Sequence, residues 1–151
     1  MANTLKTLIV YYSRSGKSEI IAKDLQSKTG YDIDKIEYSG KSKISFLIAG
    51  FEAMLRKTVK IKNTIHAPGE YDRVIFITPI WAGRMSTPIR SYMVENRANI
   101  KSYSLIAVCV GSAIDGALKD AFASVRKDPS VSERYLSRQI DNKTYDLAKF
   151  T

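Results

Sequence analysis

The chain has little of several residue types on which small proteins depend for stability or chemistry. Among its 151 residues there is one cysteine, Cys109, and one histidine, His66. A single cysteine excludes an internal disulfide, and the two residues together exclude every Cys/His zinc framework. They also argue against a Ser-His or Cys-His catalytic pair. No paired carboxylates or metal-ligand cluster stands out, so the sequence predicts no catalytic side chain and no metal site.

Long apolar runs are also missing. The first run, 8–12, is far shorter than the ~20 residues that a membrane-spanning helix needs. It is too short for the core of a signal peptide and leads into 13–18, a polar stretch without a small-residue cleavage site. We therefore predict no membrane span and an intracellular, cytoplasmic protein, which suits a single unpaired thiol.

The composition is that of an ordinary globular protein, with 44% hydrophobic and 26% charged residues. A chain of this length predicts a single domain, 1–151, that can bury about two-thirds of its unfolded surface. The 24 Lys and Arg against 15 Asp and Glu give a formal charge of +9. This charge favours anionic ligands, acidic partners or nucleic acid, but it does not choose among them.

Short apolar runs alternate with helix-like stretches along the chain. Strands are expected at 7–12, 32–38, 73–78, 104–110 and 134–140. Helices are expected at 15–28, 44–55, 87–96, 114–125 and 141–150. The alternation predicts an α/β fold, a parallel sheet covered by helices on both faces. Ligands bind such sheets beyond the carboxyl ends of the strands, which directs attention to the loops 13–18, 79–86 and 111–115.

The first of these loops joins the first strand to the first helix. It consists of Ser13, Arg14, Ser15, Gly16, Lys17 and Ser18. The hydroxyls and the free N–H groups of a helix start can donate to phosphate oxygens, and the glycine permits close backbone approach. An ordinary helix N-cap uses the same residue types. The place of the loop after the first strand favours phosphate binding.

The end of this loop, Gly-Lys-Ser at 16–18, also resembles a Walker A motif. That motif needs a glycine where Tyr11 stands. The strand 73–78 is followed by Pro-Ile-Trp and offers no acidic residue to hold magnesium. A nucleotide triphosphatase is therefore not expected.

The second loop contains Trp81, the only tryptophan, beside the small residues Ala82 and Gly83. A tryptophan at the carboxyl end of a strand can stack on a flat aromatic ligand, while its neighbours leave backbone groups free for polar edges. It can equally pack inward as a hydrophobic plug. The residue alone leaves both interpretations open.

Three stretches of the chain resemble the flavodoxin family. Residues 7–18, TLIVYYSRSGKS, are similar to its first strand and phosphate loop. Residues 71–83, YDRVIFITPIWAG, are similar to its third strand and first flavin-contacting loop. Residues 49–56, AGFEAMLR, look like a helical stretch common in single-domain bacterial and archaeal members. The resemblance runs in order along nearly the whole chain, and the two loop motifs together are fairly specific.

This resemblance implies a flavodoxin-like, three-layer doubly wound fold with strand order 2-1-3-4-5 and one bound flavin mononucleotide (FMN). It assigns the phosphate to Ser13–Ser18, the isoalloxazine ring to Pro79–Gly83, and the far edge of the ring to 111–113. The implied cofactor-binding residues are Ser13, Arg14, Ser15, Gly16, Lys17, Ser18, Pro79, Ile80, Trp81, Ala82, Gly83, Gly111, Ser112 and Ala113. Arg14, Lys17 and Arg84 are expected to face the cofactor.

Two departures from the family pattern are visible. Lys17 and Ser18 stand where asparagine and threonine are common, a change that keeps a hydroxyl and adds charge. No aromatic residue lies between Val110 and Gly116, so the stacking tyrosine of electron-transfer flavodoxins is missing there. One flavin face would then be open to substrate or to another subunit.

The resemblance implies a redox protein in which the flavin, rather than a side chain, accepts and releases electrons. Two functions stay open. One is a small electron carrier that docks on a partner protein, itself acidic; the other is an NAD(P)H:quinone-type oxidoreductase that passes hydride to a small acceptor. The missing aromatic favours the reductase and the short chain favours the carrier.

A third alternative is a basic, non-catalytic binding protein on the same fold, although nucleic acid is not the expected partner. A homodimer remains open. His66 is expected at the surface and Cys109 in an inert core. The basic cluster of Arg56, Lys57, Lys60 and Lys62 is expected to be a solvated face.

Overall fold

Five parallel strands form the centre of the computed structural model, in the order β2-β1-β3-β5-β6. The structure describes residues 4–39, 58–111 and 113–151. The strands are β1 Thr7–Tyr11, β2 Asp32–Lys35, β3 Arg73–Trp81, β5 Tyr103–Cys109 and β6 Ser132–Leu136, and the short β4 Arg84–Met85 pairs antiparallel with β3. Counted without β4, the order along the sheet is 2-1-3-4-5, which confirms the predicted topology.

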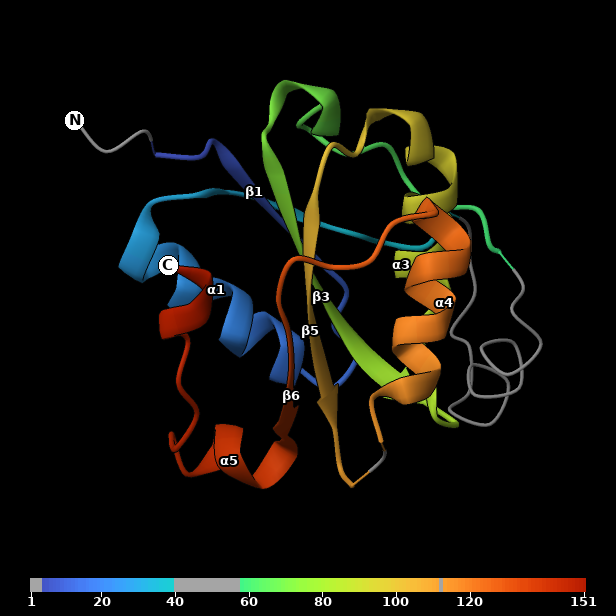
Figure 1. Ribbon diagram of the computed structural model, residues 1–151. Helices are drawn as coiled ribbons and strands as arrows, with labels where there is room; N and C mark the ends of the chain where they lie inside the picture. The colour runs from blue at the N-terminus through green and yellow to red at the C-terminus, as the bar shows by residue number, and fades with distance from the viewer. Residues whose placement is uncertain (1–3, 40–57, 112) are drawn as a thin grey trace.

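Helices cover both faces of this sheet (Figure 1). The α-helices are α1 Lys17–Thr29, α3 Thr87–Glu95, α4 Asp115–Val125 and α5 Ser137–Asp141, and the 3-10 turns are η1 Pro68–Glu70, η2 Arg97–Asn99 and η3 Ala148–Phe150. Helices α1 and α5 lie on one side of the sheet, and α3 and α4 lie on the other. The doubly wound α/β architecture is confirmed. The helix expected at 44–55 falls outside the described residues.

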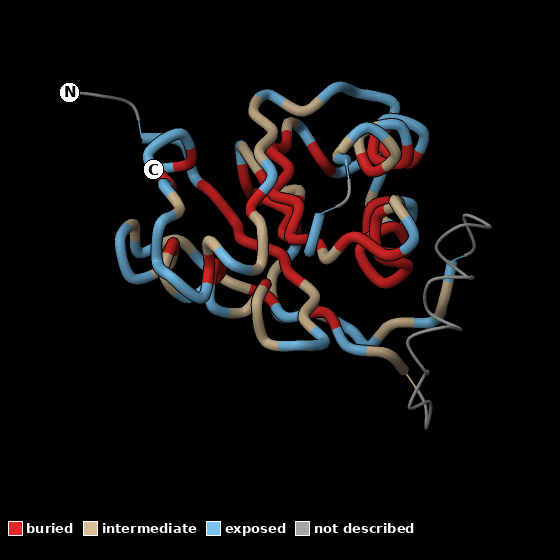
Figure 2. The backbone as a smooth tube through the Cα atoms, turned by 90° about the horizontal axis from the view of Figure 1, so that it is seen from below, coloured by how far each residue is buried: buried red, intermediate tan, exposed pale blue. Residues whose placement is uncertain are grey.

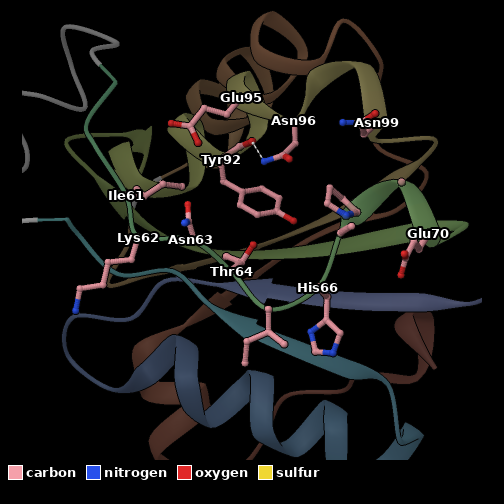
Figure 3. A pocket seen from close by; sticks show the side chains of 14 residues that line it. Ile61, Lys62, Asn63, Thr64, His66, Glu70, Tyr92, Glu95, Asn96 and Asn99 are labelled. Carbon is pink, nitrogen blue, oxygen red and sulfur yellow. Dashed lines mark hydrogen bonds between the residues drawn. The ribbon is translucent and has the colours of Figure 1, made fainter.

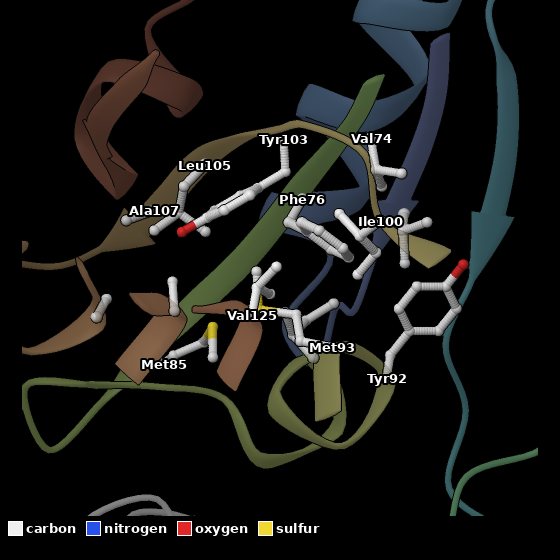
Figure 4. Close-up of a cluster of buried hydrophobic side chains, with 14 of the residues drawn as sticks. Val74, Phe76, Met85, Tyr92, Met93, Ile100, Tyr103, Leu105, Ala107 and Val125 are labelled. Carbon is white, nitrogen blue, oxygen red and sulfur yellow. The ribbon is translucent and has the colours of Figure 1, made fainter. Parts of the chain in front are cut away.

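Side chains of the strands alternate between the two layers, as the pleat of a β-strand requires. In β1, Leu8 and Val10 belong to the core under α3 and α4, whereas Ile9 and Tyr11 belong to the core under α1. Figure 4 shows the first of these cores, with aromatic rings from β3, β5 and α3. Seen from below, buried backbone runs through the centre of the molecule and exposed backbone through the loops (Figure 2). Burial on both faces explains why the central strands are continuously apolar.

Strand β3 continues three residues beyond its predicted end at Thr78, because Pro79 does not interrupt its ladder. Odd-numbered residues of β3 turn their polar backbone groups toward β1, as the bond from the Tyr12 N–H to the Ile77 carbonyl shows. Strand β1 ends at Tyr11, so the missing N–H of Pro79 faces no acceptor strand. Its partner on the other side, Val108 of β5, stays in register.

The carboxyl-terminal elements differ from the prediction. The last strand was expected to reach residue 140, but β6 ends at Leu136, where its partner β5 also ends at Cys109. The Leu136 N–H then donates to the Gln139 side chain at 2.7 Å, which helps start α5 directly. Helix α5, Ser137–Asp141, thus takes the place of the end of the predicted strand. Of the predicted helix 141–150, only Asp141 and the turn η3 are helical.

The chain returns beside the end of β2 after the undescribed residues. Tyr38 pairs antiparallel with Ile61, and backbone N–H groups donate from Ser39 to Lys60 and from Lys62 to Glu37 at 2.9 Å. In the part of the chain that the structure describes, no helix is both long and apolar enough to cross a membrane.

Candidate functional site

A cavity of about 350 Å³ opens at the carboxyl ends of the parallel strands, where doubly wound sheets bind their ligands. Its volume lies in the range of small-molecule sites. Six of the predicted cofactor-binding residues line it: Arg14, Ser15, Ser18, Pro79, Ile80 and Trp81. The structure therefore brings together the first two loops singled out in the sequence.

The loop between β1 and α1 supplies the polar wall of this cavity. Gly16, the N-cap of α1, has φ of +93°, a left-handed conformation that suits glycine. The Gly16 N–H donates to the Ser13 hydroxyl at 3.0 Å, which closes the loop. No side chain caps α1. The first-turn N–H groups, which have no acceptor within a helix, therefore lie at the same end as the Ser15 and Ser18 hydroxyls.

The predicted second loop is a β-hairpin. Trp81 pairs with Arg84 across a two-residue turn in which Ala82 and Gly83 both have positive φ, +49° and +74°. Two positive values are what the type I′ turn of tight hairpins requires. Pro79, Ile80 and Trp81 thus lie on the last part of β3, a more rigid support than an open loop.

Trp81 is buried, with 3% of its surface exposed, and it lines the cavity. Its ring meets Tyr12 edge to face at 5.5 Å, and Tyr12 meets Tyr38 in the same way at 5.7 Å. Burial raises the pKa of Tyr12, and the nearby Arg14 partly offsets that rise. The indole is therefore both a packed residue and a wall of the cavity.

A buried carboxylate holds the hairpin in place. Asp120 of α4 accepts from Arg84 Nη1 at 3.2 Å, from Arg90 Nη2 at 3.1 Å and from the Met85 N–H at 3.3 Å. Gly116 of α4 meets the turn itself, because a Cβ there would lie 2.1 Å from the Gly83 carbonyl oxygen. The wall that carries Trp81 is thus positioned by α4.

Two of the three cations expected to face the cofactor are directed elsewhere. Lys17 forms an ion pair with Asp141 of α5, and Arg84 forms one with Asp120. Neither lines the cavity, whereas Arg14 does. The expectation that Lys17 and Arg84 face the cofactor stays a prediction, and each of them has a carboxylate partner within the fold.

The remaining predicted residues lie around the cavity. Ser13 and Gly16 shape the first loop, Ala82 and Gly83 form the hairpin turn, and Ser112 falls outside the described residues. Gly111 and Ala113 are exposed and do not line the cavity. Their proposed contact with a ring edge stays a prediction.

Sequence reasoning missed four lining residues: Val108, Cys109, Val110 and Ser137. Val108 and Cys109 end β5 and Val110 follows directly, so the rule that selected the loop after that strand could have included them. Cys109 is buried as expected, but at the cavity rather than away from it. Ser137 was missed because the last strand was predicted to continue to residue 140, beyond its end at Leu136.

A larger cavity, of about 640 Å³, lies between the segment 61–70 and the carboxyl end of α3 (Figure 3). Its side chains are mainly amides, hydroxyls and carboxylates, including Asn63, Thr64 and Asn96. His66 was expected at the surface, but its ring Nδ1 lies 2.7 Å from one carboxylate oxygen of buried Asp34. The other oxygen of Asp34 accepts the backbone N–H of His66 at 2.9 Å. Within the described residues, no three His, Cys, Asp or Glu side chains gather to hold a metal ion.

Comparisons with known proteins bear on the fold. No protein-family model and no curated protein matches the chain. Among solved structures, the flavoprotein from Lactobacillus acidophilus in complex with FMN superposes with a TM-score of 0.77 at 18% identity, covering 94% of this chain and all of that one. Its apo form gives 0.63 at 18% identity, covering 91% and 96%.

A flavodoxin, WrbA-like protein from Agrobacterium tumefaciens gives a TM-score of 0.60 at 14% identity, over 89% of this chain and 85% of that one. At these identities the likeness concerns the fold. Together with the strand order and the layers described above, it shows that the chain has the flavodoxin-like fold.

Proposed function

We propose that this chain binds FMN in the cavity at the carboxyl ends of its strands and acts as a flavin-dependent redox protein. The observation that carries the proposal is the pairing, in one cavity, of a hydroxyl-bearing helix start with a buried indole. The first suits a phosphate and the second suits a flat ring. The Lactobacillus acidophilus flavoprotein of the same fold is in complex with FMN.

The chain's residues fit this cofactor by type. The hydroxyls of Ser15 and Ser18 and the uncapped start of α1 offer donors, and Arg14 adds a positive charge. Ile80, Trp81 and Val108 offer apolar surface on the other side. The compact loop serves one phosphate and shows no second fingerprint for a pyrophosphate, so we expect FMN to be preferred over the adenine dinucleotide form.

When bound, the flavin supplies the redox chemistry. The protein's part is to bind the phosphate, to orient the ring and to exclude water from its buried side. Trp81 and Pro79 lie on a strand, and α4 supports the hairpin that follows, so the ring-side wall is preorganised.

One side of the cavity mouth is open. Val110 lines the cavity with 87% of its surface exposed, and Gly111 and Ala113 beside it are exposed as well. This open side supports a reductase that admits NAD(P)H and a quinone-like acceptor, and it also leaves an edge on which a partner protein could dock. Electron carrier and small oxidoreductase are the two forms of the proposed function.

Flavin titration tests the proposal. Purified protein is titrated with FMN, riboflavin and the adenine dinucleotide, following the fluorescence of Trp81, the only tryptophan. We expect tightest binding of FMN and strong quenching at saturation. Tighter binding of the dinucleotide, or no flavin binding, would contradict the proposal. Oxidation of NADH or NADPH with a quinone then separates reductase from carrier.

A further inference from the structure

The short helix α5 contacts both the cavity and the loop proposed for the phosphate. Ser137, its first residue, lines the cavity. Asp141, its last residue, forms the ion pair with Lys17. Residues four apart lie on the same face of a helix, so one face of α5 presents both side chains toward the start of α1. Figure 1 shows α5 beyond the lower end of α1.

The ion pair joins residues that are 124 positions apart in the chain. Lys17 is the first residue of α1, directly after the N-cap Gly16. Its side chain is 26% exposed and that of Asp141 is 57% exposed, so both charges lie at the surface beside the loop. An exposed pair of this kind adds little stability, because water screens both charges. Its position beside the loop therefore matters more than its strength.

We infer that Asp141 is a positioning residue that sets the charge at the phosphate end of the proposed FMN site. It holds the Lys17 ammonium on α5, and Arg14 is left as the loop cation that lines the cavity. The inference rests on the proposed function. The ion pair as a whole is neutral. The repulsion of a bound phosphate by the Asp141 carboxylate is therefore cancelled by the attraction of the Lys17 ammonium, and either effect appears only when the other residue is replaced.

Two opposite effects follow for a phosphate dianion. Without the Asp141 carboxylate, Lys17 is free to turn toward the phosphate and a nearby negative charge is gone. Without the Lys17 ammonium, the Asp141 carboxylate stays uncompensated and repels the phosphate. A dianion ~8 Å from a unit charge in water-like surroundings changes its affinity by about fivefold before salt screening. Riboflavin, which has no phosphate, should respond to neither change.

A double-mutant cycle with two ligands tests the inference. Dissociation constants of FMN and riboflavin are measured for the wild type, Asp141→Asn, Lys17→Gln and the double variant. We expect Asp141→Asn to strengthen FMN binding about fivefold and Lys17→Gln to weaken it about fivefold. The double variant should return close to the wild type, riboflavin affinity should stay unchanged, and rising KCl should shrink both effects.

Glu133→Gln is the matched control. Glu133 forms a similar exposed pair with Lys149, at 2.8 Å, on the side of β6 away from its carboxyl end. This variant should leave the affinity ratio of FMN to riboflavin unchanged. Thermal unfolding of each variant without flavin checks that the substitution leaves the fold intact.

The outcomes separate this inference from the proposed function. If Lys17→Gln and the double variant weaken FMN binding equally while Asp141→Asn changes nothing, Lys17 holds the phosphate independently and the inference is overturned. An equal change in riboflavin affinity overturns it too, because the role of the pair is then structural. If the wild type binds no flavin, the proposed function fails first and the inference fails with it.

Discussion

The two ends of the sheet each carry a cavity, and each cavity has one wall held by a buried carboxylate. At the carboxyl ends of the strands, Asp120 of α4 holds the hairpin through Arg84 and also pairs with Arg90 of α3. Toward the other end, Asp34 ties the segment before η1 through the ring and the backbone of His66. The same device thus supports a cavity of about 350 Å³ and another of about 640 Å³.

The difference between the two ends lies in what the walls offer. The larger cavity has a cation, Lys62, and an aromatic ring, Tyr92, but its other polar side chains are mostly amides and carboxylates, and it lies beside one irregular segment and the end of α3. The smaller one combines a helix start and a cation after β1, an aromatic ring at the end of β3 and apolar side chains at the end of β5. We place the proposed FMN site at the smaller cavity because convergent chemistry, rather than volume, is typical of a cofactor site.

The largest expected effect comes from Asp120→Asn. Removal of this charge leaves the buried Arg90 and the partly exposed Arg84 without this anion. Breaking a buried pair such as that of Arg90 costs about 3–5 kcal/mol. Urea unfolding should show this loss in the free energy of unfolding, and flavin titration should show weaker FMN binding because the hairpin is no longer held.

Asp34→Asn is the matched substitution at the other end. It weakens two hydrogen bonds to His66, and we expect a smaller loss of about 1–3 kcal/mol. FMN affinity should stay unchanged. Equal loss of FMN affinity in both variants would show that the two ends are not independent.

A pair of glycine substitutions sharpens the comparison. An alanine Cβ at position 116 would lie 2.1 Å from the Gly83 carbonyl, so Gly116→Ala must displace the turn and should cost about 1–3 kcal/mol. At Gly69, which lines the larger cavity, the added Cβ would meet Asn99 at an ordinary 3.5 Å. Gly116→Ala should weaken FMN binding and Gly69→Ala should not. If both variants bind FMN like the wild type, the hairpin is not the ring-side wall.

Trp81→Ala tests the ring-side wall directly. A stacked aromatic contact is worth about 0.5–1.5 kcal/mol beyond the burial of area, which corresponds to a loss of affinity of up to roughly tenfold. Isothermal titration with FMN measures it. Tyr92→Phe, in the wall of the larger cavity, keeps its ring and should bind FMN like the wild type. Unchanged affinity in Trp81→Ala would leave Trp81 as packing alone.

The sequence predicted the fold well because the signals that define it are local. Apolar runs alternate with helical stripes, and the resemblance in the first and third strands supplied the strand order. The end of β3 was misjudged because Pro79 is harmless only where β1 has already ended, which no local pattern reveals. The partners of Lys17 and Arg84 were missed for a similar reason, since Asp141 and Asp120 lie far along the chain. Ser137 was missed because the length of β6 is set by its partner β5.

The smallest expected effect concerns alkaline pH and a tyrosine outside both cavities. The Tyr145 hydroxyl donates to Asp24 of α1 at 2.9 Å. Burial first, then this bond and the charge of Asp24, raise the pKa of Tyr145 from 10.0 to about 12. The phenol ionises at lower pH in the unfolded chain, so its stabilising contribution is complete below pH 10 and is lost as the pH rises toward 12.

Tyr145→Phe should therefore flatten the fall of the unfolding free energy between pH 10 and 12. The same measurement on Tyr12→Phe provides the comparison, because burial also raises the pKa of Tyr12 beside the smaller cavity while Arg14 partly offsets that rise. If Tyr145→Phe leaves the fall as steep as in the wild type, the bond to Asp24 contributes nothing to the alkaline stability of the α1 side of the molecule.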